Sequence, residues 1–114
     1  MPNCIFCKIA GGEIPADIVA ETEDLVAFRD LTPQAPVHIL VIPRKHIPTL
    51  NDMEACDRDI ISGAFLLAKN IAKKEGISEN GYRLVLNTNS GAGQSVFHMH
   101  LHILGGREFR WPPG

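Results

Sequence analysis

The sequence predicts a single α+β domain, spanning residues 1–114, in which a five-stranded, mainly antiparallel sheet is accompanied by one long and one short helix. Five short runs rich in apolar and β-branched residues are bounded by turn-forming residues, which is typical of strands. One longer segment, between Asn51 and Lys74, carries apolar residues at helical spacing. The 114 residues, 45% hydrophobic and 21% charged, suffice for one domain with its own core.

The short elements are each delimited by residues that end regular structure. A short helix is expected from Cys4 to Ala10, because Gly11 and Gly12 cannot sustain it. The first two strands are joined by an acidic turn and form a hairpin, and the third strand is stopped by Pro43. The five expected strands are Ile18–Glu21, Leu25–Arg29, His38–Ile42, Arg83–Asn87 and Val96–Leu104.

The long helix is expected to begin at a cap formed by Asn51 or Asp52. Lys73 and Lys74 suit its C-terminus, and Gly76 lies beyond it. Its apolar residues cover roughly 160° of the circumference, which is wider than contact with one sheet requires. Either the helix lies deep in its own core, or its second face packs on another subunit. These apolar residues are Ile60, Ile61, Ala64, Phe65, Leu67, Ala68, Ile71 and Ala72.

Composition excludes several classes of protein. A formal net charge of −2 and a pI near 6.2 argue against non-specific nucleic-acid binding, which needs a basic face. No apolar run is long enough for a membrane helix, and the start of the chain lacks a signal pattern. Three cysteines are an odd number, so a disulfide scaffold is not expected. We therefore expect a cytoplasmic protein with reduced thiols and with neither a nucleic acid nor a membrane as partner.

Three of the five histidines alternate along the last expected strand, at His98, His100 and His102. Alternate strand residues share a face, so three imidazoles line one side while Met99 and Leu101 line the apolar side. The alternative is a solvated polar face that arose by chance. The outer two histidines lie about 13 Å apart at the backbone, so one phosphate is not easily held by both. The middle ring is therefore the natural nucleophile or pivot.

The chemistry of clustered imidazoles favours reaction with phosphorus. Neighbouring rings disfavour each other's protonation, which keeps a nucleophilic ring neutral near pH 7. Neutral imidazole attacks phosphorus and leaves again, which suits a covalent intermediate. The loop before the histidines is rich in small residues, and backbone N–H groups at Gly91, Gly93, Gln94 and Ser95 can converge on phosphate oxygens.

These residues also carry a family resemblance. The run GQSVFHMHLHILGG, residues 93–106, resembles the signature of the histidine-triad superfamily. The ending Trp111-Pro112-Pro113-Gly114 resembles the Hint branch, the purine nucleoside phosphoramidases. The resemblance implies a homodimer whose sheets join across the subunit boundary. Further matching segments are IFCKI (5–9), EIPA (13–16), AFRD (27–30), PQAPVH (33–38) and LVIPRKH (40–46).

The resemblance implies roles for individual residues. His100 lies at the position of the nucleophile, which takes the nucleotidyl group and then yields it to water. His102 matches a phosphate contact, His38 a histidine that orients the nucleophile, and Ser95 a residue near the leaving group. The remaining implied nucleotide-binding residues are Asp30 for the ribose, Leu31 in the nucleoside pocket, Gly93 and Gln94 in the phosphate-binding loop, Asn87 as another polar residue of the active site, and Phe6, Ile9, Ile14 and Phe28 around the base.

The Asp30 carboxylate has two readings. Facing two vicinal hydroxyls, it would favour ribonucleosides, because a missing hydroxyl leaves one of its lone pairs unpaired. From its position at a strand end before a turn, it could equally cap that turn.

A metal site is predicted at the N-terminus. Cys4 and Cys7 form a CxxC, which with His46 and His98 would complete a closed tetrahedral zinc site. The histidines lack zinc-finger spacing, and a redox CxxC is the alternative, although no thioredoxin-like βαβ pattern surrounds it. Many bacterial members of the superfamily carry these four residues as a zinc site. Four protein ligands leave no open position, so we expect structural zinc and no catalytic metal. The isolated Cys56 is expected to be structural or idle.

The predicted function is hydrolysis of the P–N bond of a purine nucleoside 5′-monophosphoramidate, with a purine nucleoside monophosphate or phosphoramidate as ligand. Two alternatives stay open, namely dinucleoside polyphosphate hydrolysis and a nucleotide-binding module with vestigial activity. The Trp111–Gly114 ending favours the Hint branch over the first. The intact histidines and Ser95 argue against the second.

Overall fold

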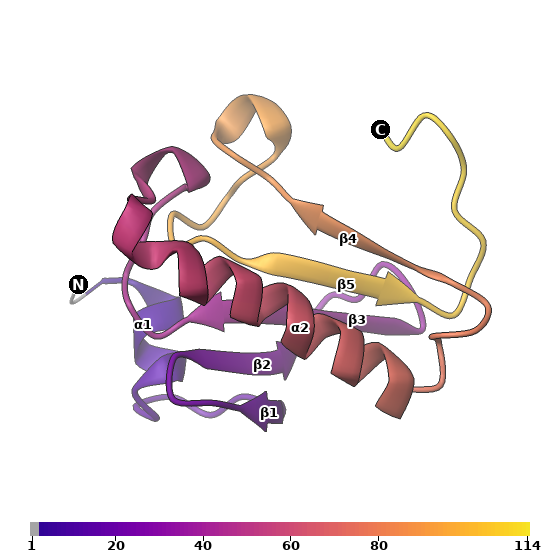
Figure 1. Cartoon of the computed structure of the whole chain (residues 1–114), viewed down its shortest axis with the longest axis horizontal. Coiled ribbons are helices and arrows are strands. Elements are labelled where there is room, and N and C mark those ends of the chain that lie inside the picture. The colour runs from indigo at the N-terminus through magenta and orange to yellow at the C-terminus, as the bar shows by residue number, and fades with distance from the viewer. Residues whose placement is uncertain (1–2) are drawn as a thin grey trace.

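The computed structural model describes residues 3–114 and confirms the α+β class (Figure 1). Five strands form one sheet in the order β1-β2-β3-β5-β4, and every neighbouring pair is antiparallel. The strands are β1 Ile18–Glu21, β2 Leu25–Arg29, β3 Val37–Pro43, β4 Tyr82–Leu86 and β5 Leu101–Gly105, and the α-helices are α1 Ile5–Ala10 and α2 Arg58–Lys74.

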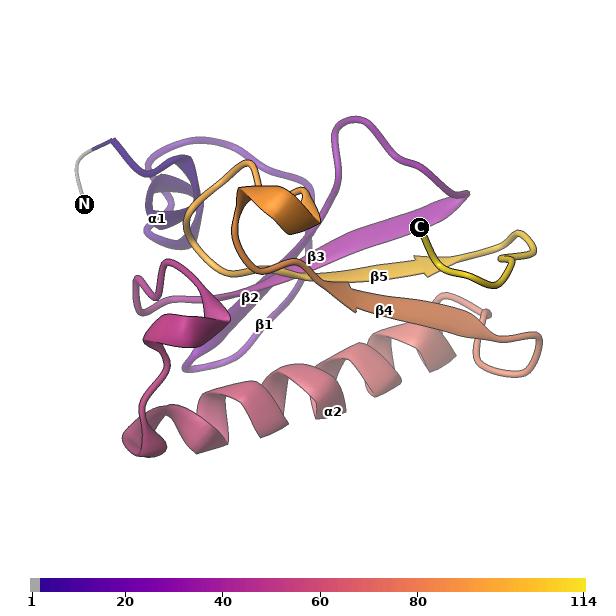
Figure 2. The same ribbon diagram turned by 90° about the horizontal axis from the view of Figure 1, so that it is seen from above.

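The two helices lie on opposite faces of the sheet (Figure 2). Because side chains alternate along a strand, β2 and β3 bury residues on both faces. On the α2 side, Ile39 and Ile103 are fully buried, each contributing about 1.5–3 kcal/mol, and they pack with Ala68 and Ile71 of the helix. On the α1 side, Phe6 packs with Phe28, Leu40 and their neighbours. His38 and His102 alternate with the α2-side residues and so belong to the α1 side.

Helix α2 starts later than predicted, at Arg58, so neither Asn51 nor Asp52 is its cap. Two 3-10 turns, Leu50–Asp52 and Ala55–Asp57, precede it, each closed by its own capping box. In the first, the Asp52 carboxylate accepts the backbone N–H and hydroxyl of Thr49. The capping boxes satisfy these backbone groups within single turns. The extended backbone at Met53 and Glu54 separates the first turn from the second, which leads directly into α2.

The exposed side of α2 carries apolar residues. Phe65 and Leu66 are 45% and 60% exposed, whereas Ala64 and Ala68 are buried against the sheet. The wide apolar face predicted for this helix is therefore only partly covered within the described chain. Neither helix is long and apolar enough to cross a membrane, over the residues that the structure describes.

The last strand is also shorter than predicted. β5 begins at Leu101, and residues 96–100 leave the sheet. Their polar groups bond elsewhere: the Met99 N–H donates to the Ile47 carbonyl at 2.7 Å. At the other strand end, Pro43 is the last residue of β3 instead of the first one beyond it. It lies past the last β3–β5 pair, Val41 with Leu101, so its missing N–H removes no bond to β5.

Candidate active site and metal-binding cluster

Three imidazoles gather on the α1 side of the sheet, where β3 pairs with the start of β5. The ring of His102 lies between those of His38 and His100, with centroid separations of 5.2 and 5.0 Å. Phe6 of α1 packs edge-on against His100 with the centroids 5.1 Å apart. His38 and His100 are buried and His102 is half-buried. The third histidine of the alternating run, His98, belongs to a different cluster.

Hydrogen bonds assign the proton on His38 and on His102. The backbone N–H of Gln34 donates to His38 Nδ1 at 3.0 Å, so this nitrogen carries a lone pair and the ring proton is on Nε2. His38 Nε2 lies 2.9 Å from His102 Nδ1 and therefore donates to it. His102 then carries its proton on Nε2. The backbone N–H of Gln34 thus fixes the tautomer of His38, which in turn fixes that of His102.

The proton on His100 is assigned in the same way. His100 Nδ1 lies 2.9 Å from the carbonyl oxygen of His98, which can only accept, so Nδ1 carries the proton. The Nε2 atom is left with the lone pair, which is the form of imidazole required of a nucleophile. After attack through Nε2 the ring would be cationic, and the same carbonyl would stabilise the charge.

The surroundings keep the neighbouring rings uncharged. Burial, reinforced by His100 and His38, lowers the pKa of His102 to about 4, while Asp30 opposes the effect. Burial also lowers the pKa of His38, again against the nearby Asp30 carboxylate. The hydrogen bond from the Gln34 N–H also disfavours protonation of His38, because a protonated Nδ1 has no lone pair to accept it.

A cavity of about 340 Å³ opens beside these rings. Nine of the residues predicted to catalyse or bind the nucleotide line it, whereas His38, Asn87, Gly93 and Gln94 do not. Sequence reasoning missed Ile5, Leu40 and Val96, which line it too. Leu40 was detectable, since it lies two residues after His38 on one strand and shares its face. The nine predicted residues are Phe6, Ile9, Ile14, Phe28, Asp30, Leu31, Ser95, His100 and His102.

The two carboxylate oxygens of Asp30 face different partners. Oδ1 accepts the backbone N–H of Thr32 at 2.8 Å, so the turn-capping alternative is correct for this oxygen. Oδ2 lies 3.5 Å from His38 Nε2, on the side of the histidine rings. One oxygen is therefore committed to the turn, and the other lies beside the His38 ring.

The loop between β4 and the histidines uses several of its own donors. The N–H groups of Gly93 and Gln94 donate to Ser90 and Asn89 carbonyls at 3.0 and 3.1 Å. The Gln94 side chain is buried, accepting the Asn89 N–H and donating to the carbonyls of Pro48 and Val96. Gly93 adopts a φ of 94°, where glycine is favoured. Gly93 and Gln94 thus shape the loop, while Ser95 is the loop residue that reaches the cavity.

The four predicted metal ligands lie together and could hold a metal ion. One ligand atom from each of Cys4, Cys7, His46 and His98 falls within 4.8 Å of all the others. The Nδ1 atom of His98 lies 3.3 Å from Cys4 Sγ and 3.3 Å from His46 Nδ1, and Cys7 Sγ lies 3.2 Å from that same His46 nitrogen. Two elements distant in sequence, the start of α1 and the segment before β5, meet here.

The donor set fits a tetrahedral ion. Ligand bonds of about 2.0–2.3 Å at tetrahedral angles separate the ligand atoms by about 3.3–3.8 Å, close to the separations observed. His98 Nε2 lies 2.7 Å from the Pro43 carbonyl and donates to it, so its Nδ1 lone pair is directed at the cluster. Burial and the adjacent Cys4 raise the pKa of the Cys7 thiol, an effect that a bound cation would reverse.

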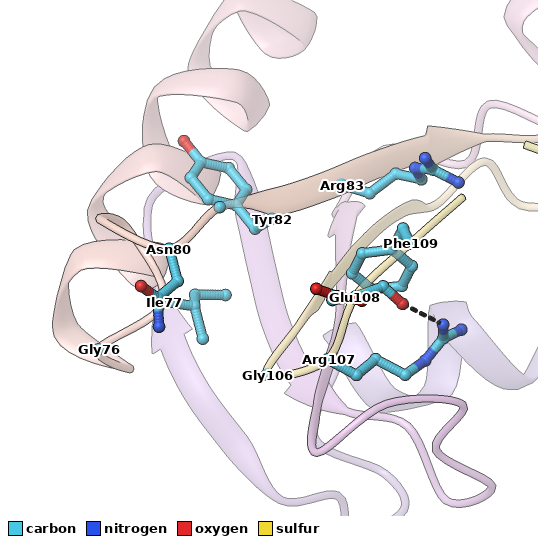
Figure 3. Close-up of a pocket in the computed structure, with 10 residues that line it drawn as sticks. Gly76, Ile77, Asn80, Tyr82, Arg83, Gly106, Arg107, Glu108 and Phe109 are labelled. Carbon is cyan, nitrogen blue, oxygen red and sulfur yellow. Dashed lines mark hydrogen bonds between the residues drawn. The ribbon is translucent and has the colours of Figure 1, made fainter. Parts of the chain in front are cut away.

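A larger groove, of about 870 Å³, lies elsewhere (Figure 3). It is lined by residues from the segment after α2, the start of β4 and the segment after β5, and contains none of the predicted site residues. Phe109 lies between two guanidinium groups, with Arg107 4.2 Å and Arg83 5.1 Å from its centroid. Size alone therefore does not locate the site in this molecule.

The fold and the histidine cluster are those of one protein family. The chain belongs to the HIT domain family, whose model matches residues 11–109. It is 52% identical over 103 residues to the purine nucleoside phosphoramidase of Escherichia coli, covering 90% of this chain and 87% of that protein. An uncharacterised HIT-like protein of Synechococcus elongatus is 52% identical over 112 residues, which cover 98% and 97% of the two chains. A crystal structure of a HIT family hydrolase from Legionella pneumophila superposes with a TM-score of 0.96 at 57% identity, covering 98% of this chain and 100% of that one.

Proposed function

We propose that this chain hydrolyses the P–N bond of purine nucleoside 5′-monophosphoramidates through a nucleotidyl-His100 intermediate. The observation that carries the proposal is the hydrogen bond from His100 Nδ1 to the His98 carbonyl, because it leaves the Nε2 lone pair available beside the cavity. The 52% identical purine nucleoside phosphoramidase of Escherichia coli supports the choice of reaction.

The reaction has two steps. His100 Nε2 forms a bond to the α-phosphorus as the P–N bond breaks, and the amine leaves after taking a proton from solvent beside Ser95. A water molecule then attacks the phosphorus, and the N–P bond to His100 breaks. The hydroxide stays on the phosphate and the proton is released to solvent. The products are a nucleoside monophosphate and a free amine. His102, with its proton on Nε2, would donate to a phosphate oxygen, and His38 would hold His102 in that tautomer.

The nucleoside would lie in the same cavity. Phe6, Ile9, Ile14 and Phe28 would flank the base, and Leu31 would close the ribose side. The Asp30 carboxylate would accept from the ribose hydroxyls through the oxygen that is not bonded to Thr32. Gly93, Gln94 and Asn87 would act around the phosphate, the first two by setting the conformation that presents Ser95.

We further propose that the Cys4, Cys7, His46 and His98 cluster holds structural zinc. When bound, zinc would supply a fixed charge centre that ties α1 to the segment before β5, and no catalytic metal is needed. Thiolate ligands require reducing conditions, which agrees with a cytoplasmic location.

A homodimer is the proposed assembly, each chain acting as one domain. β4 lies at one edge of the sheet, so its outer side is available to a second copy. The exposed Phe65 and Leu66 on α2 and the large groove at the start of β4 supply further surface. Mass measurement in solution tests this proposal, and a monomer at micromolar concentration would contradict it.

The reaction class is tested by comparing kcat/KM for adenosine 5′-phosphoramidate and diadenosine tetraphosphate on one preparation. The proposal predicts preference for the phosphoramidate. Preference for the dinucleotide would favour the polyphosphate hydrolase alternative, and nucleotide binding without turnover of either would favour a vestigial module.

A further inference from the structure

The metal-binding cluster and the nucleotide cavity are built from the same two segments of the chain. Helix α1 begins beside Cys4, carries Cys7 and lines the nucleotide cavity with Phe6. The segment before β5 supplies the cluster residue His98 and, two residues later, the proposed nucleophile His100. Each segment therefore takes part in both sites.

The Phe6 side chain touches both sites. It is buried, and it stands between Cys4 and Cys7 in the sequence. Its ring meets that of His98 edge-on with the centroids 6.0 Å apart, and it meets that of His100 edge-on at 5.1 Å. Both separations lie within the range of about 4.5–7 Å that is typical of aromatic pairs. A displacement of the Phe6 ring would thus disturb a member of the cluster and the nucleophile together.

A backbone link accompanies this side-chain contact. The His98 side chain is fully buried, with Nδ1 3.3 Å from Cys4 Sγ and Nε2 2.7 Å from the Pro43 carbonyl oxygen. The carbonyl oxygen of His98 itself accepts the hydrogen bond from His100 Nδ1 at 2.9 Å. The residue that would bind the metal through its ring thus holds the nucleophile through its peptide group.

Helix α1 depends on its surroundings for its position. Six residues are too few for a helix to be stable on its own in water. Its first turn is capped by the Cys4 sulfur, which accepts the Cys7 N–H at 3.3 Å. A metal ion in the cluster and a nucleotide in the cavity would each have to order this same helix. The first of them to bind therefore lowers the entropic cost of binding the second.

We propose that Phe6 is a positioning residue that couples the metal-binding cluster to the nucleotide cavity, so that zinc and a nucleoside monophosphate each strengthen the binding of the other. The inference rests on the proposed nucleotide and zinc sites and adds the linkage between them. The linkage is reciprocal, because zinc must lower the Kd of the nucleotide by the same factor as the nucleotide lowers the Kd of zinc. Couplings of this kind typically amount to about 5- to 150-fold, and we expect about tenfold here.

The coupling is measured by binding on the full chain. Isothermal titration calorimetry gives the Kd of adenosine monophosphate for zinc-loaded and for zinc-free protein, and we expect binding to be about tenfold tighter when zinc is present. In a second measurement, zinc-loaded protein is mixed with excess chromogenic chelator, and saturating adenosine monophosphate should slow the transfer of zinc about tenfold. This second measurement starts from loaded protein, so it does not depend on the stability of the zinc-free form.

Two variants separate the coupling from simple loss of contact with the nucleotide. Phe6→Leu keeps an apolar side chain but removes the ring that meets His98 and His100, and both factors should fall to about twofold. Ile14→Ala is the matched control, because Ile14 also lines the nucleotide cavity but lies outside α1 and outside the segment before β5. It should weaken adenosine monophosphate binding equally in the zinc-loaded and zinc-free proteins and leave both factors unchanged.

The outcomes are distinguishable from failure of the proposed function. Equal nucleotide Kd values with and without zinc, together with zinc transfer that ignores the nucleotide, would overturn the coupling and leave the phosphoramidase function standing. Full coupling in Phe6→Leu, or equal loss of it in Phe6→Leu and Ile14→Ala, would overturn the role of Phe6. Absence of adenosine monophosphate binding to either form of the unmodified protein would overturn the nucleotide site as well.

Discussion

The neutral state of His102 has a measurable consequence for stability. Its pKa is lowered from 6.5 to about 4 in the folded protein, first by burial and then by the neighbouring His100 and His38. Between these two pH values the unfolded chain binds a proton on this residue and the folded chain does not. The free energy of unfolding therefore falls as the pH is lowered from 6.5 toward 4, and this residue causes no further loss below that.

The size of the effect follows from the difference in pKa. A pKa difference of about 2.5 corresponds to about 3.4 kcal/mol at full strength. His102 is only half-buried, so solvent screening reduces the expected contribution, and we take about 2 kcal/mol. The variant His102→Asn does not titrate and therefore lacks this pH-dependent contribution to the free energy of unfolding. Its side-chain oxygen can still accept the hydrogen bond from His38 Nε2.

Urea denaturation of both proteins at pH 7.5, 6.0, 5.0 and 4.5 measures the effect. A Cys4→Ser/Cys7→Ser background removes metal loss as a second source of pH dependence. The unmodified His102 protein should lose about 2 kcal/mol more than His102→Asn between pH 7.5 and 4.5. Parallel pH curves for the two proteins would refute the assignment of a buried, neutral His102.

Three further predictions concern the metal, the ribose and the core. Cys4→Ser/Cys7→Ser should lose one equivalent of zinc by elemental analysis relative to the unmodified protein, and a metal-free unmodified protein purified without chelator would contradict the zinc site. Asp30→Ala should lower the ratio of kcat/KM for adenosine over 2′-deoxyadenosine phosphoramidate by about tenfold, whereas an unchanged ratio would leave Asp30 a turn cap only. Gly105→Ala should destabilise the fold by about 1–3 kcal/mol in urea denaturation, because its Cβ would lie 2.5 Å from Ile77 Cδ1. Gly91→Ala, which meets nothing within 4 Å, is the control, and equal stability of the two variants would contradict the packing.

Elements stabilised by local contacts were predictable from the sequence. β1 and β2 have the predicted bounds, because the turn between them is closed by Thr22, whose hydroxyl accepts the N–H groups of Asp24 and Leu25. The start of α2 was not predictable in this way. The Thr49 to Asp52 spacing is also that of a helix cap, and here the same hydrogen bonds close an isolated 3-10 turn.

Long-range contacts explain what the sequence pattern missed. Residues 96–100 alternate like a strand, but His98 bonds to the Pro43 carbonyl and Met99 to Ile47, which draws the segment out of the sheet. Alternation still grouped His100 with His102, whereas His98 lies in the metal-binding cluster. The Gln34 N–H that sets the His38 tautomer is a backbone group of a loop, so no side-chain pattern could reveal it.

The central claim is that His100 carries the nucleotidyl group, and trapping the intermediate tests it most directly. Enzyme mixed with stoichiometric adenosine phosphoramidate is quenched in alkali within one turnover, and its intact mass and peptides are measured. We predict the added mass of one adenylyl group, located on His100. His100→Ala should show no adduct and no turnover while retaining adenosine monophosphate binding. An adduct located on His102 or His98, or undiminished turnover by His100→Ala, would contradict the account.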